Sequence, residues 1–251
     1  MKALFSLVSL SGLLLLSGCF DQKKNVSQNH ILIVGTESNF PPFSCKENGE
    51  LAGFDIDVVT EVAKRIGKTI EFKDMNFEAL LPQVQLGAIQ VVAAGMTPTA
   101  ERAKIVSFTE PYIIGDPLII VTLADSDTKD LEDLKKGRRV VVNQGYTADF
   151  YMSKVDGPEL IRLETPAEAF LSLQQGRADA YVTAKNTLAP FFKKRDAEGF
   201  ERKIIPGTDE STALIVSKKY PELLREIQEA LNQMESDGTM KSLKKKWDMN
   251  A

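Results

Sequence analysis

Residues 90–102 read QVVAAGMTPTAER, and this stretch decides the fold class. Residues 90–93 are a short apolar run of the kind that forms a buried strand. The Gly/Thr turn that starts at Gly95 leads into a helix, and the first backbone N–H groups of a helix have no partner within it. Open α/β sheets bind ligands at such strand ends. The stretch therefore predicts an α/β fold with a ligand-facing turn.

The chain before this stretch alternates strands with helices. Residues 31–35 (ILIVG) and 69–73 have the apolar patterns of strands, and apolar residues repeat with helical spacing over 55–67 and 77–86. Together with the strand at 90–93, this alternation predicts a parallel sheet with helices on both faces.

The same alternation restarts after this stretch. Strands are predicted at residues 118–123, 138–143, 160–163, 180–183, 202–205 and 213–217, and helices from residue 148 and at 166–175, 185–195 and 221–236. A chain that leaves one α/β unit and later returns to it crosses twice, so we expect two sheets joined by a double-strand hinge, with a ligand cleft between them. The expected parts are lobe 1 (30–112 and 214–251), lobe 2 (117–208) and the hinge crossings (113–116 and 209–213).

Composition narrows the functional classes. The 251 residues carry 31 Lys+Arg against 35 Asp+Glu, a net charge of -4, and 43% are hydrophobic. These values are typical of a globular protein and not of a disordered chain or a multi-span membrane protein. The acidic balance lacks the basic excess of a nucleic-acid-binding protein. One His and two Cys exclude sites that need several such ligands, and we expect neither metal nor cofactor.

The N-terminus has the features of an export signal. Lys2 precedes an apolar run over residues 3–16, which is too short for a comfortable bilayer span, and then Leu-Ser-Gly-Cys19. This pattern resembles the lipobox of bacterial lipoproteins, which implies a signal peptide at 1–18 and acylation of Cys19 with chains such as palmitate. The polar residues 19–29 then form a tether. The alternative is an anchoring or buried helix with an incidental cysteine.

Three predicted loops at strand ends carry candidate binding groups. They cover residues 36–43, 95–102 and 143–147. The last two enter helices, whose free N–H groups suit an anion, and Arg102 adds a planar fork that matches a carboxylate. Glu37 supplies the opposite charge. Phe40 and Phe77 are placed to sandwich an extended side chain, and a guanidinium there gains cation–π attraction.

The ordered motifs VGTESNFPPF, GFDIDV, GMTPTAER, SFTEPY and NQGYT give the chain a family resemblance. Over residues 31–247 it resembles the extracytoplasmic solute-binding proteins of polar amino-acid ABC transporters. The resemblance implies a type II periplasmic-binding-protein fold, a monomer that binds a small ligand without catalysis, and a membrane permease as partner. It also implies export to the cell envelope, with the lipid-anchored protein facing the periplasm if the cell has two membranes.

Residue by residue, the resemblance assigns the ligand's backbone groups. Gly95, Thr97 and Arg102 match the positions that hold the α-amino and α-carboxylate groups, and Thr147 matches the second lobe's contact to the carboxylate. Ala184 is a departure, because the family commonly has an Asp there that pairs with the ligand ammonium. Asn186, Glu210 or water are the substitutes we consider.

The side-chain subsite favours arginine. Phe40 and Phe77 match the family's aromatic walls, and Glu37 matches an acidic position that meets the far end of the ligand. Glutamine binders also carry an acid here. The alternatives without a role in binding are core packing for the two Phe residues, a helix cap or solvated charge for Glu37, and an N-cap for Thr147. At the level of function, the alternatives are an amino-acid-sensing or surface-interaction lipoprotein, and a small-acid dehydratase on the same scaffold.

Overall fold

The structure is a computed structural model that describes residues 30–193 and 197–249. The predicted signal peptide (1–18), Cys19 and the tether (19–29) lie outside the described residues. Within the described ranges, no helix is both long enough and apolar enough to cross a bilayer.

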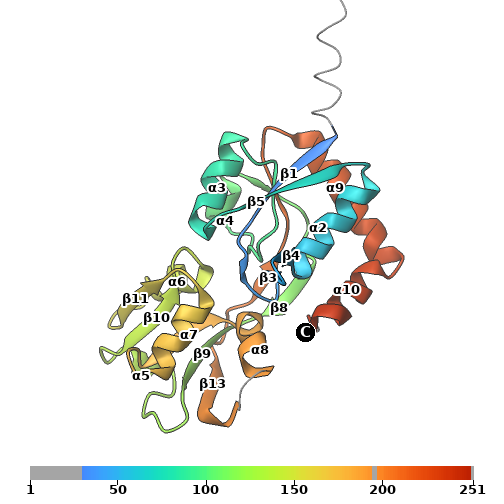
Figure 1. Ribbon diagram of the computed structural model, residues 1–251. Helices are drawn as coiled ribbons and strands as arrows, with labels where there is room; N and C mark the ends of the chain where they lie inside the picture. The colour runs from blue at the N-terminus through green and yellow to red at the C-terminus, as the bar shows by residue number, and fades with distance from the viewer. Residues whose placement is uncertain (1–29, 194–196, 250–251) are drawn as a thin grey trace, which may run out of the picture.

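Two five-stranded sheets organise the chain, each within its own lobe (Figure 1). The first has the order β5-β1-β6-β15-β7, and its strands are β1 (Ile31–Thr36), β5 (Thr69–Asp74), β6 (Val91–Val92), β7 (Ser107–Phe108) and β15 (Ile215–Val216). β1 pairs in parallel with β5 and β6, whereas β15 is antiparallel to β6 and β7. The predicted parallel pairing of the strands at 31–35, 69–73 and 90–93 is confirmed, whereas the sheet as a whole is mixed, because β15 returns from the other lobe in the opposite direction.

The second sheet repeats this mixed pattern. Its order is β11-β10-β12-β9-β13, with strands β9 (Leu118–Leu123), β10 (Arg139–Asn143), β11 (Glu159–Leu163), β12 (Ala180–Ala184) and β13 (Phe200–Ile204). β10 is parallel to β11 and β12, and β9 is antiparallel to β12 and β13. Alternate residues of β9 point to opposite faces, so Leu118 and Ile120 enter one apolar core while Ile119 and Val121 enter another.

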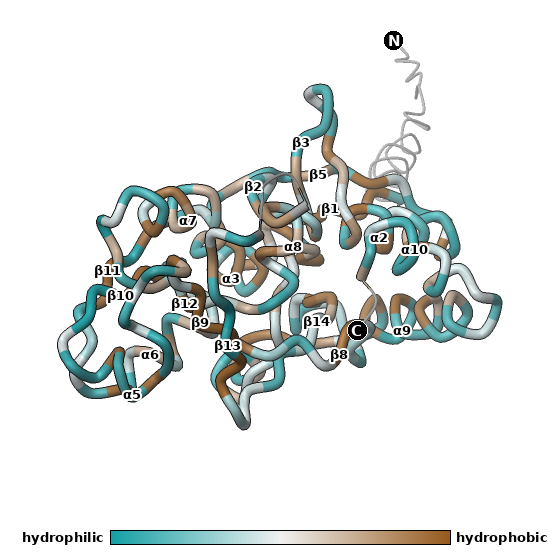
Figure 2. The backbone as a smooth tube through the Cα atoms, turned by 90° about the horizontal axis from the view of Figure 1, so that it is seen from below, coloured by the Kyte–Doolittle hydropathy of each residue, from teal (hydrophilic) through white to brown (hydrophobic). Residues whose placement is uncertain are grey.

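Helices cover both sheets and leave their hydrophilic faces outside (Figure 2). The first lobe carries α2 (Phe54–Arg65), α3 (Phe77–Leu86), α4 (Ala100–Ala103), α9 (Pro221–Ser236) and α10 (Thr239–Trp247); the second carries α5 (Leu131–Leu134), α6 (Thr147–Met152), α7 (Pro166–Gln174), α8 (Lys185–Lys193) and the 3-10 turn Ala197–Gly199. α9 begins with Pro221 in its first turn and buries Leu223, Ile227 and Met234 on one face. α10 had no counterpart among the sequence predictions.

A small antiparallel sheet precedes α2 and was also not predicted. Its strands are β2 (Asn39–Phe40), β3 (Ser44–Glu47) and β4 (Glu50–Ala52). It begins within the predicted loop at 36–43, and Phe43 packs beside Phe40, with ring centroids 5.0 Å apart. The hairpin therefore fixes one wall of the space between the lobes.

The chain passes between the sheets twice. β8 (Ile113–Asp116) leads from β7 to β9, and β14 (Glu210–Thr212) leads from β13 to β15. The two strands pair antiparallel, with Asp116 opposite Glu210. Both acidic residues therefore lie side by side between the lobes.

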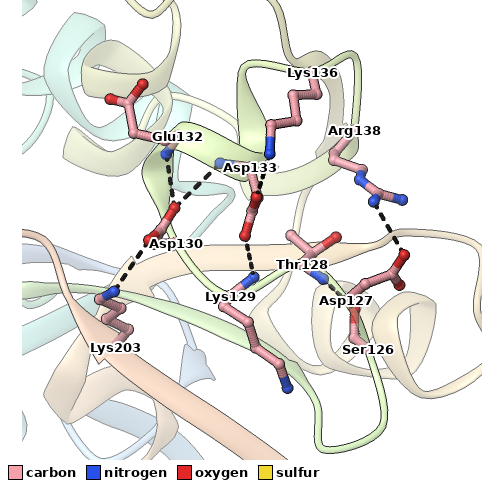
Figure 3. A network of polar contacts seen from close by, with 10 residues as sticks. All are labelled: Ser126, Asp127, Thr128, Lys129, Asp130, Glu132, Asp133, Lys136, Arg138 and Lys203. Carbon is pink, nitrogen blue, oxygen red and sulfur yellow. Dashed lines mark hydrogen bonds and ion pairs between the residues drawn. The ribbon is translucent and has the colours of Figure 1, made fainter.

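The far end of the second lobe is fixed by surface charges (Figure 3). The Asp130 carboxylate caps α5 by accepting bonds from the Glu132 and Asp133 N–H groups, and it also pairs with Lys203 at 3.2 Å. Lys203 lies on β13, so this network holds α5 against the edge of the sheet, away from the space between the lobes.

Candidate functional site

A small cavity of about 30 Å³ lies where the two lobes and the two crossing strands meet. Six of the seven predicted binding residues line it, namely Phe40, Phe77, Gly95, Thr97, Arg102 and Thr147. The seventh, Glu37, is not part of the lining and reaches it through Tyr146. The lining also contains Phe43, Asp116, Tyr146, Ala148, Thr183, Ala184, Thr187, Glu210 and Thr212.

The turn of the first lobe is held by a buried carboxylate. Gly95 has a φ of 61°, and its N–H donates to Asp55 Oδ2 at 2.6 Å, while the Tyr112 hydroxyl donates to Asp55 Oδ1 at 2.9 Å. A Cβ at Gly95 would come within 2.3 Å of the Phe40 ring, so the turn needs glycine for both its backbone angle and its space. Burial raises the pKa of Asp55 to about 7.

Arg102 places a nearly buried cation beside this turn. Its side chain leaves α4, whose N-cap is Thr99, and only 5% of the residue is exposed. The guanidinium donates to the Thr97 carbonyl at 2.8 Å and, across the lobes, to the Gly145 carbonyl at 3.0 Å. Its Nε has no hydrogen-bond partner among the described residues. Burial lowers the pKa of Arg102 to about 10, so the group stays cationic at neutral pH and keeps one unused donor.

One carboxylate links the two lobes at the cavity. The hydroxyls of Thr97 and Thr147 both donate to Glu210 Oε2, at 2.6 Å and 2.5 Å. Thr97 belongs to the first sheet's turn, Thr147 begins α6 in the second lobe, and Glu210 lies on the crossing strand β14. The predicted carboxylate contacts are therefore brought together from both lobes.

Tyr146 fills the space between the predicted aromatic walls. Its ring centroid lies 5.2 Å from that of Phe40 and 4.5 Å from that of Phe77. Its hydroxyl donates to Glu37 Oε2 at 3.0 Å. Burial raises the pKa of Glu37 to about 7, although the bond from Tyr146 opposes the shift. Tyr146 was not among the predicted binding residues, because its local sequence does not indicate that its ring contacts Phe40 and Phe77.

A second buried acid lies beside the departure at Ala184. Asp116 is 4% exposed, lines the cavity and accepts a bond from the Asn186 backbone N–H at 2.9 Å. Burial raises the pKa of Asp116 to about 6. Thr187, also in the lining, has a buried hydroxyl with no partner among the described residues. The sequence reasoning missed both Asp116 and Thr187, whereas it had considered Asn186, which does not line the cavity.

A wider groove of about 820 Å³ lies outside the cavity. Phe77, Arg102, Thr147 and Glu210 line both spaces, so the groove reaches the cavity along these side chains. No group of three or more His, Cys, Asp or Glu residues in the described part of the chain is arranged to hold a metal ion.

Comparisons with known proteins agree with the geometry. The family model described as bacterial extracellular solute-binding proteins, family 3, matches residues 32–250. The arginine-binding extracellular protein ArtP of Bacillus subtilis (strain 168) is 32% identical over 222 residues, which cover 86% of this chain and 85% of ArtP. The ABC transporter glutamine-binding protein GlnH of the same organism is 30% identical over 269 residues, covering 98% of this chain and 97% of GlnH.

A solved structure supports the fold. An ancestral arginine-binding protein bound to arginine matches with a TM-score of 0.81 and 39% identity, covering 87% of this chain and 98% of that one. The predicted two-lobed α/β fold is confirmed by this agreement. These relatives are named as binding proteins, which agrees with the prediction that the chain is not an enzyme.

Proposed function

The chain belongs to the bacterial extracellular solute-binding proteins of family 3, and from this premise we propose that it captures a free α-amino acid between its lobes and delivers it to the permease of an ABC transporter. In this proposal the lobes open and close about β8 and β14, and the hinge crossings are those expected from the sequence, at 113–116 and 209–213. Acylation at Cys19 holds the exported protein at the membrane.

The proposal rests mainly on the arrangement of hydrogen-bonding groups around Arg102. A buried cation with an unused Nε donor lies beside two threonine hydroxyls, one from each lobe. An α-carboxylate entering the cavity satisfies that donor and contacts both lobes at once. Because a ligand that touches both lobes binds the closed arrangement better than the open one, it shifts the equilibrium toward closure.

The ligand's ammonium group needs another acidic partner in this chain, because Ala184 stands where the family commonly has an Asp. Asp116 and Glu210 are the acids in the cavity lining, and they lie opposite each other on the crossing strands. We assign the ammonium to Asp116, because this carboxylate accepts the Asn186 N–H bond and so lies beside the departure at Ala184. The raised pKa of Asp116 falls again when a cation binds beside it.

The identity of the side chain rests on Glu37 and the two Phe rings. These residues favoured arginine in the sequence, and ArtP is named for arginine while GlnH is named for glutamine. In this structure, however, an arginine side chain reaches Glu37 only after Tyr146 leaves the space between Phe40 and Phe77. The proposal therefore commits to the α-amino acid class, with arginine as the long-chain candidate.

Titration calorimetry of an Arg102→Ala variant tests the proposal. The ligand carboxylate would be left buried without its charged partner, and lost hydrogen bonds to charged groups are worth about 1.5–3 kcal/mol each, so we expect affinity to fall by about a hundredfold or more. Arg138→Ala removes a surface arginine that pairs with Asp127 at 3.5 Å, and it should leave binding unchanged. Equal affinity of the wild type and the Arg102 variant would refute the carboxylate assignment.

A further inference from the structure

Tyr146 makes the contacts that a long ligand side chain would make. Its ring lies between the Phe40 and Phe77 rings, and its hydroxyl donates to Glu37, the acid at the far end of this space. Only 7% of the residue is exposed. The protein's own side chain thus occupies the whole length of the subsite, from the aromatic walls to the acid.

The backbone of Tyr146 is held in place, so the ring does not leave by a shift of the turn. The Tyr146 N–H donates to the Asn143 carbonyl at 3.1 Å, and the neighbouring Gly145 N–H donates to the Asp149 carboxylate at 3.1 Å. While the lobes are closed, removal of the ring requires a rotation of the side chain, which breaks the bond to Glu37 and exposes the aromatic surface. Glu37 is then left buried without its hydroxyl donor.

The space that remains favours a short ligand. The cavity of about 30 Å³ is lined by Arg102, Asp116 and Glu210, where the ligand's backbone groups are expected, and is bounded by the Tyr146 ring. A long side chain has no room between the Phe rings while Tyr146 is there, whereas a hydrogen, methyl or hydroxymethyl group does not need that space.

We propose that Tyr146 determines specificity by filling the side-chain subsite, so that the protein selects α-amino acids with short, uncharged side chains, of the size of glycine, alanine or serine. This inference rests on the proposed function. Arginine and glutamine place their side chains between the Phe rings and against Glu37 only by displacing the Tyr146 ring, and the free energy of that displacement is subtracted from their affinity.

The test is calorimetric titration of the wild type, Tyr146→Ala and Tyr146→Phe with glycine, alanine, serine, glutamine and arginine. We expect the wild type to bind a short amino acid most tightly. Because burying one large side chain is worth about tenfold to a hundredfold in an equilibrium, the Ala variant should bind arginine more tightly than the wild type by that factor. The Phe variant keeps the ring and should keep the wild-type preference.

Two further variants locate the effect. Adding Glu37→Gln to Tyr146→Ala should remove more of the gained affinity for arginine than for glutamine, because only arginine brings a cation to that acid. Tyr151→Ala removes another aromatic ring from α6 that does not line the cavity, and the order of preference should not change.

The outcomes separate the inference from the proposed function. If the wild type binds arginine as tightly as Tyr146→Ala does, and Arg102 is still required, the Tyr146 inference is wrong while amino-acid capture stands. If neither protein binds any amino acid, both are wrong. The wild-type panel alone decides the preference if the Ala variant does not fold.

Discussion

In each lobe, a hydrogen bond from a glycine N–H to an Asp carboxylate holds the ligand-facing turn, but the surroundings of the two carboxylates differ. In the first lobe, the Gly95 N–H donates to Asp55, which is fully buried and pairs with no cationic side chain within the described ranges. In the second lobe, the Gly145 N–H donates to Asp149, which also pairs with the half-exposed Arg162 at 2.9 Å. Both carboxylates are thus buried, but the second also pairs with a cation that reaches solvent.

The lobes also differ in what they offer a ligand. The first contributes the charge and the rings through Glu37, Phe40, Phe77 and Arg102, whereas the second contributes hydroxyl groups and the Tyr146 ring. We therefore expect an amino acid to dock on the first lobe and the second lobe to close over it. The difference implies that equivalent changes in the two turns have unequal effects.

The largest expected difference comes from replacing the two turn glycines. Both have positive φ, 61° at Gly95 and 75° at Gly145, so each Ala variant carries backbone strain. At Gly95 the new methyl group also meets Phe40 at 2.3 Å, whereas at Gly145 the nearest atom, Cγ of Glu78, is 3.4 Å away. Strain and overpacking together predict a loss of about 2–5 kcal/mol for Gly95→Ala and about 1–2 kcal/mol for Gly145→Ala.

Urea unfolding of both variants measures this difference. Similar losses at the two positions would mean that the first turn is no more rigid than the second, and the comparison between the lobes would fail.

The next effect concerns Asp116, which belongs to a crossing strand and to neither lobe. Asp116→Asn keeps the oxygen that accepts the Asn186 N–H bond and removes the charge assigned to the ammonium. Loss of one charge-assisted hydrogen bond predicts about a tenfold to hundredfold fall in affinity. Asp179→Asn is the matched control, since Asp179 pairs with Arg139 at 2.7 Å at the edge of the second sheet. Calorimetry showing equal affinities for the two variants would place the ammonium elsewhere.

The sequence predicted those parts of the site that depend on the order of strands, turns and helices along the chain. The strand-turn-helix units placed Gly95, Thr97, Arg102 and Thr147 at one cavity, because the ends of strands meet where the lobes face each other. It did not predict the mixed sheets, since the direction of β15 depends on the path of the chain through the other lobe.

The residues missed by sequence reasoning act through tertiary contacts. Asp116 follows an unremarkable glycine, and only the pairing of β8 with β14 brings it beside Glu210. Tyr146 has the same local pattern whether its ring points to solvent or into the cleft. Its position between Phe40 and Phe77 depends on how close the lobes lie, which local spacing does not encode.

A further expected effect is a pH dependence of stability that arises from the buried carboxylate of the first turn. The pKa of Asp55 is raised from its ordinary 3.8 to about 7, so the folded protein keeps a proton that the unfolded chain releases near pH 4. Raising the pH from about 4.5 to 7.5 removes that proton and therefore lowers the free energy of unfolding. Glu37 and Asp116 have raised pKa values and act in the same direction.

The carboxylates with lowered pKa values do not interfere in this range. Asp133 and Asp237 have pKa values of about 2, so their stabilising effect is complete above pH 4 and is lost only as the pH falls further. Urea unfolding at the two pH values should show a weaker pH dependence in Asp55→Asn than in the wild type. A wild-type stability that rises across this range would contradict the assignment.

The central claim is that Arg102 grips a free carboxylate between the lobes, and the ligand itself offers the most direct test. Calorimetry should compare the amino acid that binds most tightly with its α-amide, which keeps the ammonium and the side chain but loses the negative charge. We predict that the amide binds about a hundredfold or more weakly, because it cannot pair with the buried guanidinium. Equal binding of acid and amide would contradict the account.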